Sequence, residues 1–455
     1  MSVFDLVILG GGSGGYACAL RSAQLGLSVA LIEADKLGGT CLHRGCIPTK
    51  ALLHSGEIAD GARDASHFGV NAQFLSMDMP AVNSYKDGVI SKLHKGLQGL
   101  VKSRNITYIE GHGKLVAKDT IEVNGEKITG KNIILATGSY ARSLPGLDID
   151  GVKIMTSDHA TKLDYVPKSV IVLGGGVIGC EFASVWKSFG ADVTIIEGLP
   201  HLVALEDESS SKLLERAYRK RGIKFELGVR FKSHKVDGNG VTVTLEDGRE
   251  FSAEILLVSV GRGPVTDGVG YQEVGIAMDR GYITVDDHCR TNIPGIFAVG
   301  DIIPTLQLAH VGFQEGILVA ETIAGLNPRP INYDGVPRVT YSEPEVASVG
   351  LSTKIAKERG YDVVELDYNL AGNGKAQILK TAGSIKLVAE KNGPVLGIHM
   401  VGARVGELLA EAQLIFNWEA SADDVAPLVH AHPTLSEAMG EAHMALAGKP
   451  LHAHG

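Results

Sequence analysis

A glycine-rich turn near the N-terminus separates two short, largely apolar runs. The first run, Phe4 to Leu9, ends at Gly10, and apolar positions spaced as on a helix follow it up to Gly26. The second run, 28–32, stops at Glu33. Continuous apolar runs bounded by glycine are typical of buried parallel strands. We therefore predict a strand, a glycine turn, a helix and a second strand, in this order.

The same pattern recurs at an offset of 164 residues, from Gly10 to Gly174. The apolar run Ser169 to Leu173 precedes the second turn, and in both copies an acid, Glu33 or Glu197, stands 23 residues after the first glycine. Both turns fit the spacing G-x-G-x-x-G, with Gly10, Gly12 and Gly15 in the first copy and Gly174, Gly176 and Gly179 in the second. One such turn is weak evidence, but two copies with matching internal spacing predict two dinucleotide-binding units.

Later segments supply further strands. A strand at 132–135 runs into Ala136-Thr137-Gly138, and a strand at 254–258 leads to Gly261. Each looks like the final buried strand of a nucleotide-binding domain, ending where the backbone passes close to a ligand. Another strand precedes Gly300-Asp301.

The last part of the chain, from about residue 337, changes character. It contains strands at 384–389 and 393–400, followed by helices at 406–418 and 435–447, which is typical of an α+β domain. We therefore predict an α/β protein with two Rossmann-like dinucleotide-binding domains and a C-terminal α+β domain. The predicted segments are 1–145, 146–266, 267–336 and 337–455.

Composition narrows the class of protein. The chain has 455 residues, which suggests about three units, and 57 glycines, as expected for many tight turns and close approaches of backbone to ligand. No apolar run is long enough to span a membrane, and the net charge of -9 argues against nucleic acid or anionic membranes as partners. A strand begins within three residues of the N-terminus, so we expect no signal peptide and a cytoplasmic location.

Two cysteines, Cys41 and Cys46, are the candidate reactive groups. On a regular helix their Cα atoms would be roughly 8.6 Å apart, whereas a disulfide needs less than about 7 Å. If the two sulfurs are bonded, the backbone between them must be irregular, which Gly45 and Pro48 permit. A cysteine pair in a chain without secretory features is more often metal-binding or redox-active than structural. His452 and His454 at the C-terminus resemble a metal tract only superficially, and we expect no metal site.

The two glycine turns predict which nucleotides bind. A glycine turn at a helix N-terminus presents free N–H groups to a pyrophosphate, and an acid after the second strand accepts hydrogen bonds from a ribose 2′-OH. Glu197 has no arginine just after it, which favours NAD over NADP at the second turn. Two dinucleotides and a cysteine pair form a redox chain in which a nicotinamide, a flavin and a dithiol each exchange two electrons.

At this point the chain resembles the flavoprotein disulfide reductases over essentially its whole length. The resemblance rests on these motifs: GGGSGG at 10–15, GGTCLHRGCIPTKALLH at 38–54, ATG at 136–138, GGGVIGCE at 174–181, AVGD at 298–301, LQLAH at 306–310 and HAHPTLSE at 430–437. The pair Cys-x4-Cys followed by Ile-Pro-x-Lys is highly specific to this family. Where Asn-Val often stands between the cysteines, this chain has His43-Arg44, two potential cations that could lower the thiol pKa values or contact a partner protein.

The resemblance implies roles for the predicted segments and for individual residues. It implies an FAD-binding domain at 1–145, an NAD-binding domain at 146–266, a central domain at 267–336 that completes the FAD site, and a C-terminal α+β dimerisation domain at 337–455. Cys41 would exchange with the substrate and Cys46 would lie beside the flavin, with Lys50 at the flavin and paired with Glu181. Asp301 would hydrogen-bond the ribityl chain of FAD. Further contacts to FAD are implied for Gly10, Gly12, Gly15, Glu33, Gly39, Thr40, Gly113, Thr137, Gly138, Leu308, Ala309 and His310, and contacts to NAD for Gly174, Gly176, Gly179, Glu197 and Gly261.

His432 is implied to be the base. A dithiol attacks only as a thiolate, and histidine is the side chain that titrates near neutrality. Glu437 would orient the ring through its other nitrogen. His430 competes for this role, but the match to His-Pro-Thr-x-x-Glu selects His432, and we expect His430 to pack.

The resemblance also implies an activity. It implies oxidation of dihydrolipoyl groups on lipoylated carrier proteins by way of the Cys41–Cys46 disulfide, FAD and NAD, in a homodimer whose active sites are shared between subunits. A glutathione-type enzyme would carry arginine in place of Glu197, a mercuric reductase would have further cysteines after Cys289, and a soluble transhydrogenase would lack Cys46. A non-catalytic nucleotide-binding module is the alternative of another class, and the complete set of predicted catalytic residues argues against it.

Overall fold

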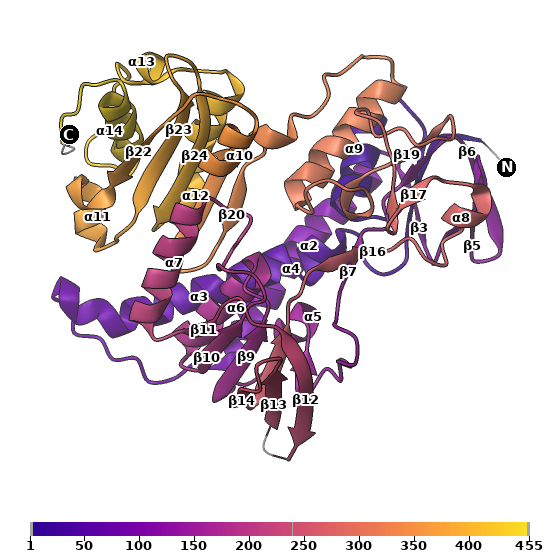
Figure 1. The fold of residues 1–455 in the computed structure, drawn as a ribbon. Coiled ribbons are helices and arrows are strands. Elements are labelled where there is room, and N and C mark those ends of the chain that lie inside the picture. Colours follow the sequence, from indigo (N-terminus) through magenta and orange to yellow (C-terminus); the bar gives the residue numbers. More distant parts are fainter. Residues whose placement is uncertain (1–2, 239, 453–455) are drawn as a thin grey trace.

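A parallel sheet carries the first glycine turn. The computed structural model describes residues 3–238 and 240–452, and Figure 1 shows this sheet in the lobe near the N-terminus. Strand β1 (Phe4–Leu9) lies between β2 (Val29–Glu33) and β6 (Glu126–Leu135) in parallel register, and helix α1 (Ser13–Gln24) follows the turn. Because residues 6–9 are at most 4% exposed, the strand is buried on both faces, as its apolar run predicts.

The third predicted segment, 267–336, joins this same lobe. Strand β19 (Ile296–Ala298) pairs in parallel with β6, and helix α9 (Ala309–Ile323) packs on α1. A Cβ on Gly316 would lie 2.3 Å from the carbonyl oxygen of Gly14, so a glycine is required where the two helices cross. The segment therefore shares one hydrophobic core with the N-terminal segment. The predicted boundaries themselves stay predictions.

The second glycine turn lies in a sheet of the same design. Strand β9 (Ser169–Leu173) pairs in parallel with β10 (Asp192–Ile196) and β15 (Ile255–Val258), and helix α6 (Val177–Phe189) connects β9 to β10. Gly190 ends α6 in the left-handed conformation, with φ 110°. The repeat in the sequence is thus a repeat in the structure.

The remaining helices and strands connect and extend these sheets. A small antiparallel sheet of three strands, β12 to β14, lies below the second sheet in Figure 1. The other elements are α2 (Gly39–His43), α3 (Cys46–Asp64), η1 (Ala65–Phe68), α4 (Met79–Ser103), β3 (Thr107–Glu110), β4 (Lys114–Ala117), β5 (Thr120–Val123), β7 (Ser139–Ala141), β8 (Ile154–Met155), α5 (Ser157–Ala160), α7 (Glu208–Arg221), β11 (Lys224–Glu226), β12 (Phe231–Asp237), β13 (Gly240–Leu245), β14 (Glu250–Ala253), β16 (Arg262–Pro264), α8 (Tyr271–Val274), β17 (Met278–Asp279), β18 (Tyr282–Ile283), η2 (Gly300–Ile302), η3 (Tyr333–Gly335), β20 (Arg338–Thr340), β21 (Glu345–Gly350), α10 (Thr353–Glu358), β22 (Val363–Asn369), η4 (Leu370–Gly372), α11 (Gly374–Leu379) and α13 (Ala422–Val425). Within the described ranges, no helix combines the length and the apolar character needed to cross a membrane.

The C-terminal lobe is built on an antiparallel sheet of order β20-β21-β24-β23-β22. Strands β23 (Ser384–Glu390) and β24 (Val395–Gly402) contact helices α14 (Glu437–Leu446) and α12 (Val405–Asn417) respectively. These four elements lie within two residues of the predicted bounds, and the α+β prediction is confirmed. Strands β20, β21 and β22 were not predicted.

Helix α3 joins the lobes. It starts at Cys46 beside the first glycine turn and packs along α6 of the second sheet. At its far end the guanidinium of Arg221 donates to the Asp60 carboxylate at 2.8 Å and to the Glu343 carbonyl at 3.1 Å. This contact ties α3 to α7 and to the C-terminal lobe, so the side chains on α3 are held relative to all three lobes.

Candidate active site

The backbone between the two cysteines is irregular, as predicted. Helix α2 ends after His43 and α3 begins at Cys46, with Gly45 between them at φ -120° and ψ -101°. The Gly45 amide donates to the Thr40 carbonyl at 2.8 Å. Two short helices therefore meet at a corner instead of one helix running through, and this corner brings the two thiols together.

Cys41 and Cys46 are present as free thiols. Interaction with Cys46 and burial raise the pKa of Cys41, whereas interaction with Cys41 lowers the pKa of Cys46 despite burial. The ammonium of Lys50 lowers the pKa of Cys46 further. The charges around the pair thus favour a thiolate at Cys46 over one at Cys41.

The predicted pair of Lys50 and Glu181 is present. The Lys50 ammonium donates to both Glu181 carboxylate oxygens at 2.8 Å, across 131 residues of sequence. Glu181 also accepts the Tyr341 amide N–H at 3.0 Å, and the Lys50 Nζ lies 4.6 Å from the centre of the Tyr341 ring. Burial lowers the pKa of Lys50, but the Glu181 carboxylate outweighs burial and leaves this pKa above its ordinary value.

Tyr341 is a residue that the sequence did not single out. It follows β20 in the C-terminal lobe, so it connects that lobe to the lysine next to Cys46. Its ring face can stabilise the ammonium through a cation–π contact. The sequence offered little indication of this role, because a tyrosine after a short half-exposed strand is common in proteins and does not by itself indicate a functional site.

His43 and Arg44 each have a partner other than the thiols. The His43 ring bonds the Leu37 carbonyl at 2.9 Å and packs edge-on against His94, while Arg44 forms an ion pair with Asp35. Among the leading causes of the Cys46 pKa shift, the cation is Lys50. An effect of His43 and Arg44 on the thiols, or a contact with a partner protein, stays a hypothesis.

The first glycine turn forms an open cradle at the N-terminus of α1. Gly10 has φ 109° and a Cβ there would lie 2.1 Å from the Ala136 carbonyl, so this glycine is required by the fold. Gly12 has open space above it, since a Cβ there would meet only the Cα of Gly39, at 3.9 Å. No side chain caps α1, so its first N–H groups are free to bind an anion. The cradle fits the pyrophosphate of a dinucleotide such as FAD.

Glu33 closes this cradle. Its carboxylate accepts the Gly11 amide at 2.6 Å and the Asp35 amide at 2.8 Å. The acid thus holds the glycine turn against the end of β2, and its position at the strand end agrees with the predicted contact to a ribose.

The second turn repeats this geometry. A Cβ on Gly179 would lie 1.9 Å from the Gly174 carbonyl, whereas one on Gly176 would meet nothing within 4 Å. Glu197 accepts the Gly175 amide at 2.5 Å and the Leu199 amide at 2.7 Å, and α6 also lacks a side-chain cap. The site fits NAD as the first fits FAD. Gly261, at φ 108° and with open space around it, lies just beyond the end of β15 in the same sheet.

The other predicted FAD residues gather around the first cradle. Gly39 lies against it, since a Cβ there would be 2.7 Å from the Cα of Gly12. Thr137 donates to the Val265 carbonyl at 2.6 Å, and Gly138 follows with φ 75°. Thr40 lies in α2 next to Gly39. Thr137 and Gly138 follow the C-terminal end of β6, and Gly39 and Thr40 are the first two residues of α2.

Three further predicted contacts lie on neighbouring segments. Leu308 precedes α9 and Ala309 begins it, and this helix also has no side-chain cap. His310 bonds the Pro337 carbonyl at 2.9 Å. Gly113 packs on the strand ends, because a Cβ there would lie 2.5 Å from the Leu9 side chain. Packing alone therefore accounts for this glycine.

The predicted base lies far from the thiols of its own chain. The His432 ring bonds the Glu437 carboxylate at 2.8 Å and is 78% exposed. Burial raises the pKa of Glu437, but hydrogen bonds from the Thr434 amide and from His432 outweigh burial and leave this pKa below its ordinary value. The competitor His430 packs as predicted, with its ring bonded to Glu411 at 2.7 Å and 13% exposed. Helix α14, which follows His432, lies in the C-terminal lobe at the upper left of Figure 1, whereas α2 lies near the middle of the molecule.

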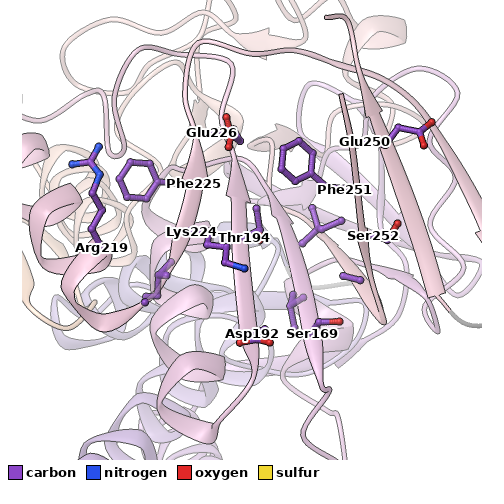
Figure 2. A pocket seen from close by; sticks show the side chains of 15 residues that line it. Ser169, Asp192, Thr194, Arg219, Lys224, Phe225, Glu226, Glu250, Phe251 and Ser252 are labelled. Carbon is purple, nitrogen blue, oxygen red and sulfur yellow. The ribbon is translucent and has the colours of Figure 1, made fainter. Parts of the chain in front are cut away.

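A groove of about 760 Å³ lies elsewhere, between the second sheet and β14. Figure 2 shows it lined by Ser169, Asp192 and Lys224, the first residues of β9, β10 and β11. The glycine turn follows the opposite ends of these strands, so this groove is separate from the nucleotide cradle.

The part of the chain that the structure describes holds no group of three or more His, Cys, Asp or Glu side chains placed to hold a metal ion. The absence of a metal site stays a prediction. The His452 ring bonds the Glu441 carboxylate at 2.8 Å. His454 lies outside the described residues.

Comparison with known proteins agrees with this geometry. Residues 4–316 match the family described as pyridine nucleotide-disulphide oxidoreductase, and residues 336–443 match its dimerisation domain. A dihydrolipoyl dehydrogenase of Bacillus subtilis is 41% identical, covering 99% of both chains, and a mitochondrial dihydrolipoyl dehydrogenase of Pisum sativum is 40% identical, covering 98% of this chain and 92% of the other.

A solved structure, LpdA from Mycobacterium tuberculosis, superposes with a TM-score of 0.91 at 28% identity and covers 98% of this chain and 100% of the other. The two family matches together include both glycine turns, the corner between α2 and α3 that carries the two cysteines, and most of the C-terminal lobe. The chain therefore belongs to the pyridine nucleotide-disulphide oxidoreductases, the flavoprotein disulfide reductases.

Proposed function

We propose that this chain is a dihydrolipoyl dehydrogenase, which oxidises dihydrolipoyl groups on lipoylated carrier proteins and reduces NAD+ to NADH. The observation that carries this proposal is the thiol pair Cys41–Cys46 beside the Lys50–Glu181 ion pair, next to a dinucleotide cradle. It stands in a chain about 40% identical to enzymes of that name. The enzyme uses FAD and NAD and forms a homodimer.

The chain's own groups account for the thiol steps. In the oxidised enzyme Cys41 and Cys46 form a disulfide. His432 takes the proton of one dihydrolipoyl thiol, and the resulting thiolate attacks Cys41, which breaks the disulfide and leaves Cys46 as a thiolate. The second dihydrolipoyl thiol then attacks the substrate sulfur that is bonded to Cys41, which closes the lipoyl disulfide and breaks the bond to Cys41. Its proton passes to the departing Cys41 sulfur, which is released as a thiol, while His432 keeps the first proton.

The first glycine turn would hold FAD, which would supply a two-electron acceptor between the reduced cysteine pair and NAD+. Lys50 holds Cys46 in the thiolate form needed for that transfer, because its ammonium favours the negative sulfur. Glu181 keeps the lysine charged and in place, since an unpaired buried charge would be costly.

The base is proposed to come from the second subunit. The exposure of His432, the exposed apolar side chains Trp418 and Val429 nearby in sequence, and the match of 336–443 to a dimerisation domain support this arrangement. Glu437 orients the ring through Nδ1, which leaves Nε2 free to face a thiol. A cytoplasmic location stays a prediction.

Turnover of defined substrates tests the proposal. We expect the purified protein to reduce NAD+ with dihydrolipoamide, to prefer NAD+ over NADP+, and to turn over glutathione disulfide or mercuric ion poorly with NADH or NADPH. Cys46→Ser should keep FAD but lose dihydrolipoamide oxidation. A Cys46→Ser variant that still reduced NAD+ with dihydrolipoamide at near wild-type rate would disprove the cycle.

A further inference from the structure

Glu315 is a fully buried acid that the proposed cycle does not use. It lies in α9 and is 0% exposed, yet its carboxylate is bonded by three donors. One oxygen accepts the Gly300 amide at 2.6 Å, and the other accepts the Thr305 hydroxyl at 2.9 Å and the Tyr333 hydroxyl at 3.0 Å. These donors come from the turn at η2, from the loop before α9 and from η3.

The Gly300 contact is the informative one. Gly300 has φ 76° and begins the turn whose next residue, Asp301, is predicted to bond the ribityl chain of FAD. Gly300 is half-buried, and its amide donates to the fully buried Glu315 carboxylate. This bond fixes the position of the backbone just before Asp301.

The side chain of Asp301 is held separately. Its carboxylate accepts the Ser139 hydroxyl and lies 4.0 Å from the Arg262 guanidinium, which itself donates to the Ser139 hydroxyl at 2.7 Å. Glu315 thus acts on the backbone of the turn, while Ser139 and Arg262 act on its side chain. The two sets of contacts leave the turn little freedom.

A buried acid at this place is costly, which argues against an incidental residue. Burial raises the pKa of Glu315 to about 7, against the opposing effect of the three hydrogen bonds. The ionisable groups that face it are Asp301, Tyr333 and Cys289. An apolar side chain would avoid this cost but would leave the Gly300 amide unpaired.

We propose that Glu315 is a positioning residue for FAD, which sets the Gly300–Asp301 turn through its bond to the Gly300 amide. The inference rests on the proposed function only in so far as FAD binds at this turn. In this arrangement the Glu315 side chain acts through its length, which brings an acceptor oxygen to the Gly300 amide, and not through its negative charge.

Two substitutions separate reach from charge. Glu315→Gln keeps an acceptor at the same length but removes the charge, whereas Glu315→Asp keeps the acid but shortens the side chain by one methylene. The measurement is the rate of FAD release from the holoenzyme, followed by the rise in FAD fluorescence. Loss of one hydrogen bond to a buried amide corresponds to roughly 10- to 100-fold, so we expect that acceleration in Glu315→Asp and less than about threefold in Glu315→Gln.

Matched variants on the same helix control for stability. Leu318→Ala creates a cavity at a 2% exposed position in α9 and should lower the melting temperature without accelerating FAD release. Glu321→Gln removes an acid that pairs with Arg21 nearer the surface and should change neither quantity. Acceleration equal to that of Glu315→Asp in the leucine variant would overturn the inference.

The remaining outcomes are also decisive. Fast release in Glu315→Gln with slow release in Glu315→Asp would assign the effect to charge, and unchanged release in Glu315→Asp would remove the role entirely; either result overturns the inference. Turnover of dihydrolipoamide by the wild-type enzyme is measured separately. Failure of that turnover would reject the proposed function while leaving the FAD-release result valid.

Discussion

At the scale of single residues, Lys50 is the cation whose charge lowers the pKa of Cys46. It is held in place by Glu181 and by the face of the Tyr341 ring. His43 and Arg44 were the obvious candidates in the sequence because they stand between the cysteines, but their side chains turn to Leu37 and Asp35. Adjacency in sequence did not predict proximity of charge.

We expect Lys50→Met to raise the lower of the two thiol pKa values by about one unit, because the ammonium is lost and the Glu181 carboxylate remains. A higher pKa leaves less thiolate at neutral pH, so alkylation of the reduced enzyme by iodoacetamide should slow near pH 7 and recover at higher pH. Lys50→Arg keeps the charge and should stay close to wild type. An unchanged alkylation profile in the methionine variant would remove Lys50 from this role.

We expect His432→Gln to lower kcat/KM for dihydrolipoamide by roughly 10²- to 10⁴-fold, the usual contribution of a positioned base. Oxidation of NADH by ferricyanide, which needs no thiol deprotonation, should be kept. The matched control is His430→Gln, since this ring is buried against Glu411 and should affect melting temperature more than kcat/KM. Equal losses in the two variants would contradict the assignment of the base.

At the scale of elements, the two glycine turns have the same geometry. In each, the first and last glycines are required because a Cβ would strike backbone, whereas the middle glycine faces open space. The sequence shows six glycines of equal appearance. The structure divides them into those that allow the fold and those that leave room for a pyrophosphate.

This division predicts different outcomes for two similar substitutions. In Gly176→Ala the added methyl group would have no protein atom within 4 Å, so the melting temperature should stay unchanged. The same methyl group would crowd the predicted pyrophosphate, so KM for NAD+ should rise roughly tenfold or more. In Gly179→Ala the Cβ would lie 1.9 Å from the Gly174 carbonyl, so the lobe should be destabilised. Thermal unfolding and steady-state kinetics distinguish them. A Gly176→Ala enzyme with wild-type KM would place the pyrophosphate elsewhere.

Elements differ in how well their sequence predicts them. β1 and β9 were predicted to the residue, because strands buried on both faces read as unbroken apolar runs that end in glycine. β20 to β22 were missed. β22 alternates between half-buried and exposed positions, and β20 has three residues, so neither contains a long apolar run. The contact between β19 and β6 was also not visible, since more than a hundred residues separate the two strands.

At the scale of the whole molecule, helix α14, which follows His432, lies in the C-terminal lobe, apart from helix α2, which carries Cys41 (Figure 1). Arg221 and the α3–α6 contact hold the lobes together, so the fold gives no sign that His432 could swing to Cys41 of its own chain. A homodimer with shared sites resolves this separation, as proposed above.

Mixed dimers test the sharing. In a dimer of one Cys46→Ser chain and one His432→Ala chain, shared sites leave one site with both an intact thiol pair and an intact base. Random mixing of equal amounts gives half mixed dimers with one of two sites intact, so we expect about a quarter of wild-type activity. Each variant alone should be nearly inactive. If every site were contained in one chain, the mixture would be as inactive as its parents.

The sequence by itself determined the local and repeated features: two strand–turn–helix units, the acids that follow them, and a cysteine pair that no regular helix could bridge. These features depend on short-range sterics and on periodicity, which are properties of neighbouring residues. Only the tertiary structure decided which cation lies beside Cys46, that Tyr341 completes the Lys50–Glu181 pair, and that Glu315 holds the turn at Gly300. Coulomb interactions and hydrogen bonds act over a few ångströms in space, and folding brings together residues that are far apart in sequence, such as Lys50 and Tyr341, which are 291 positions apart.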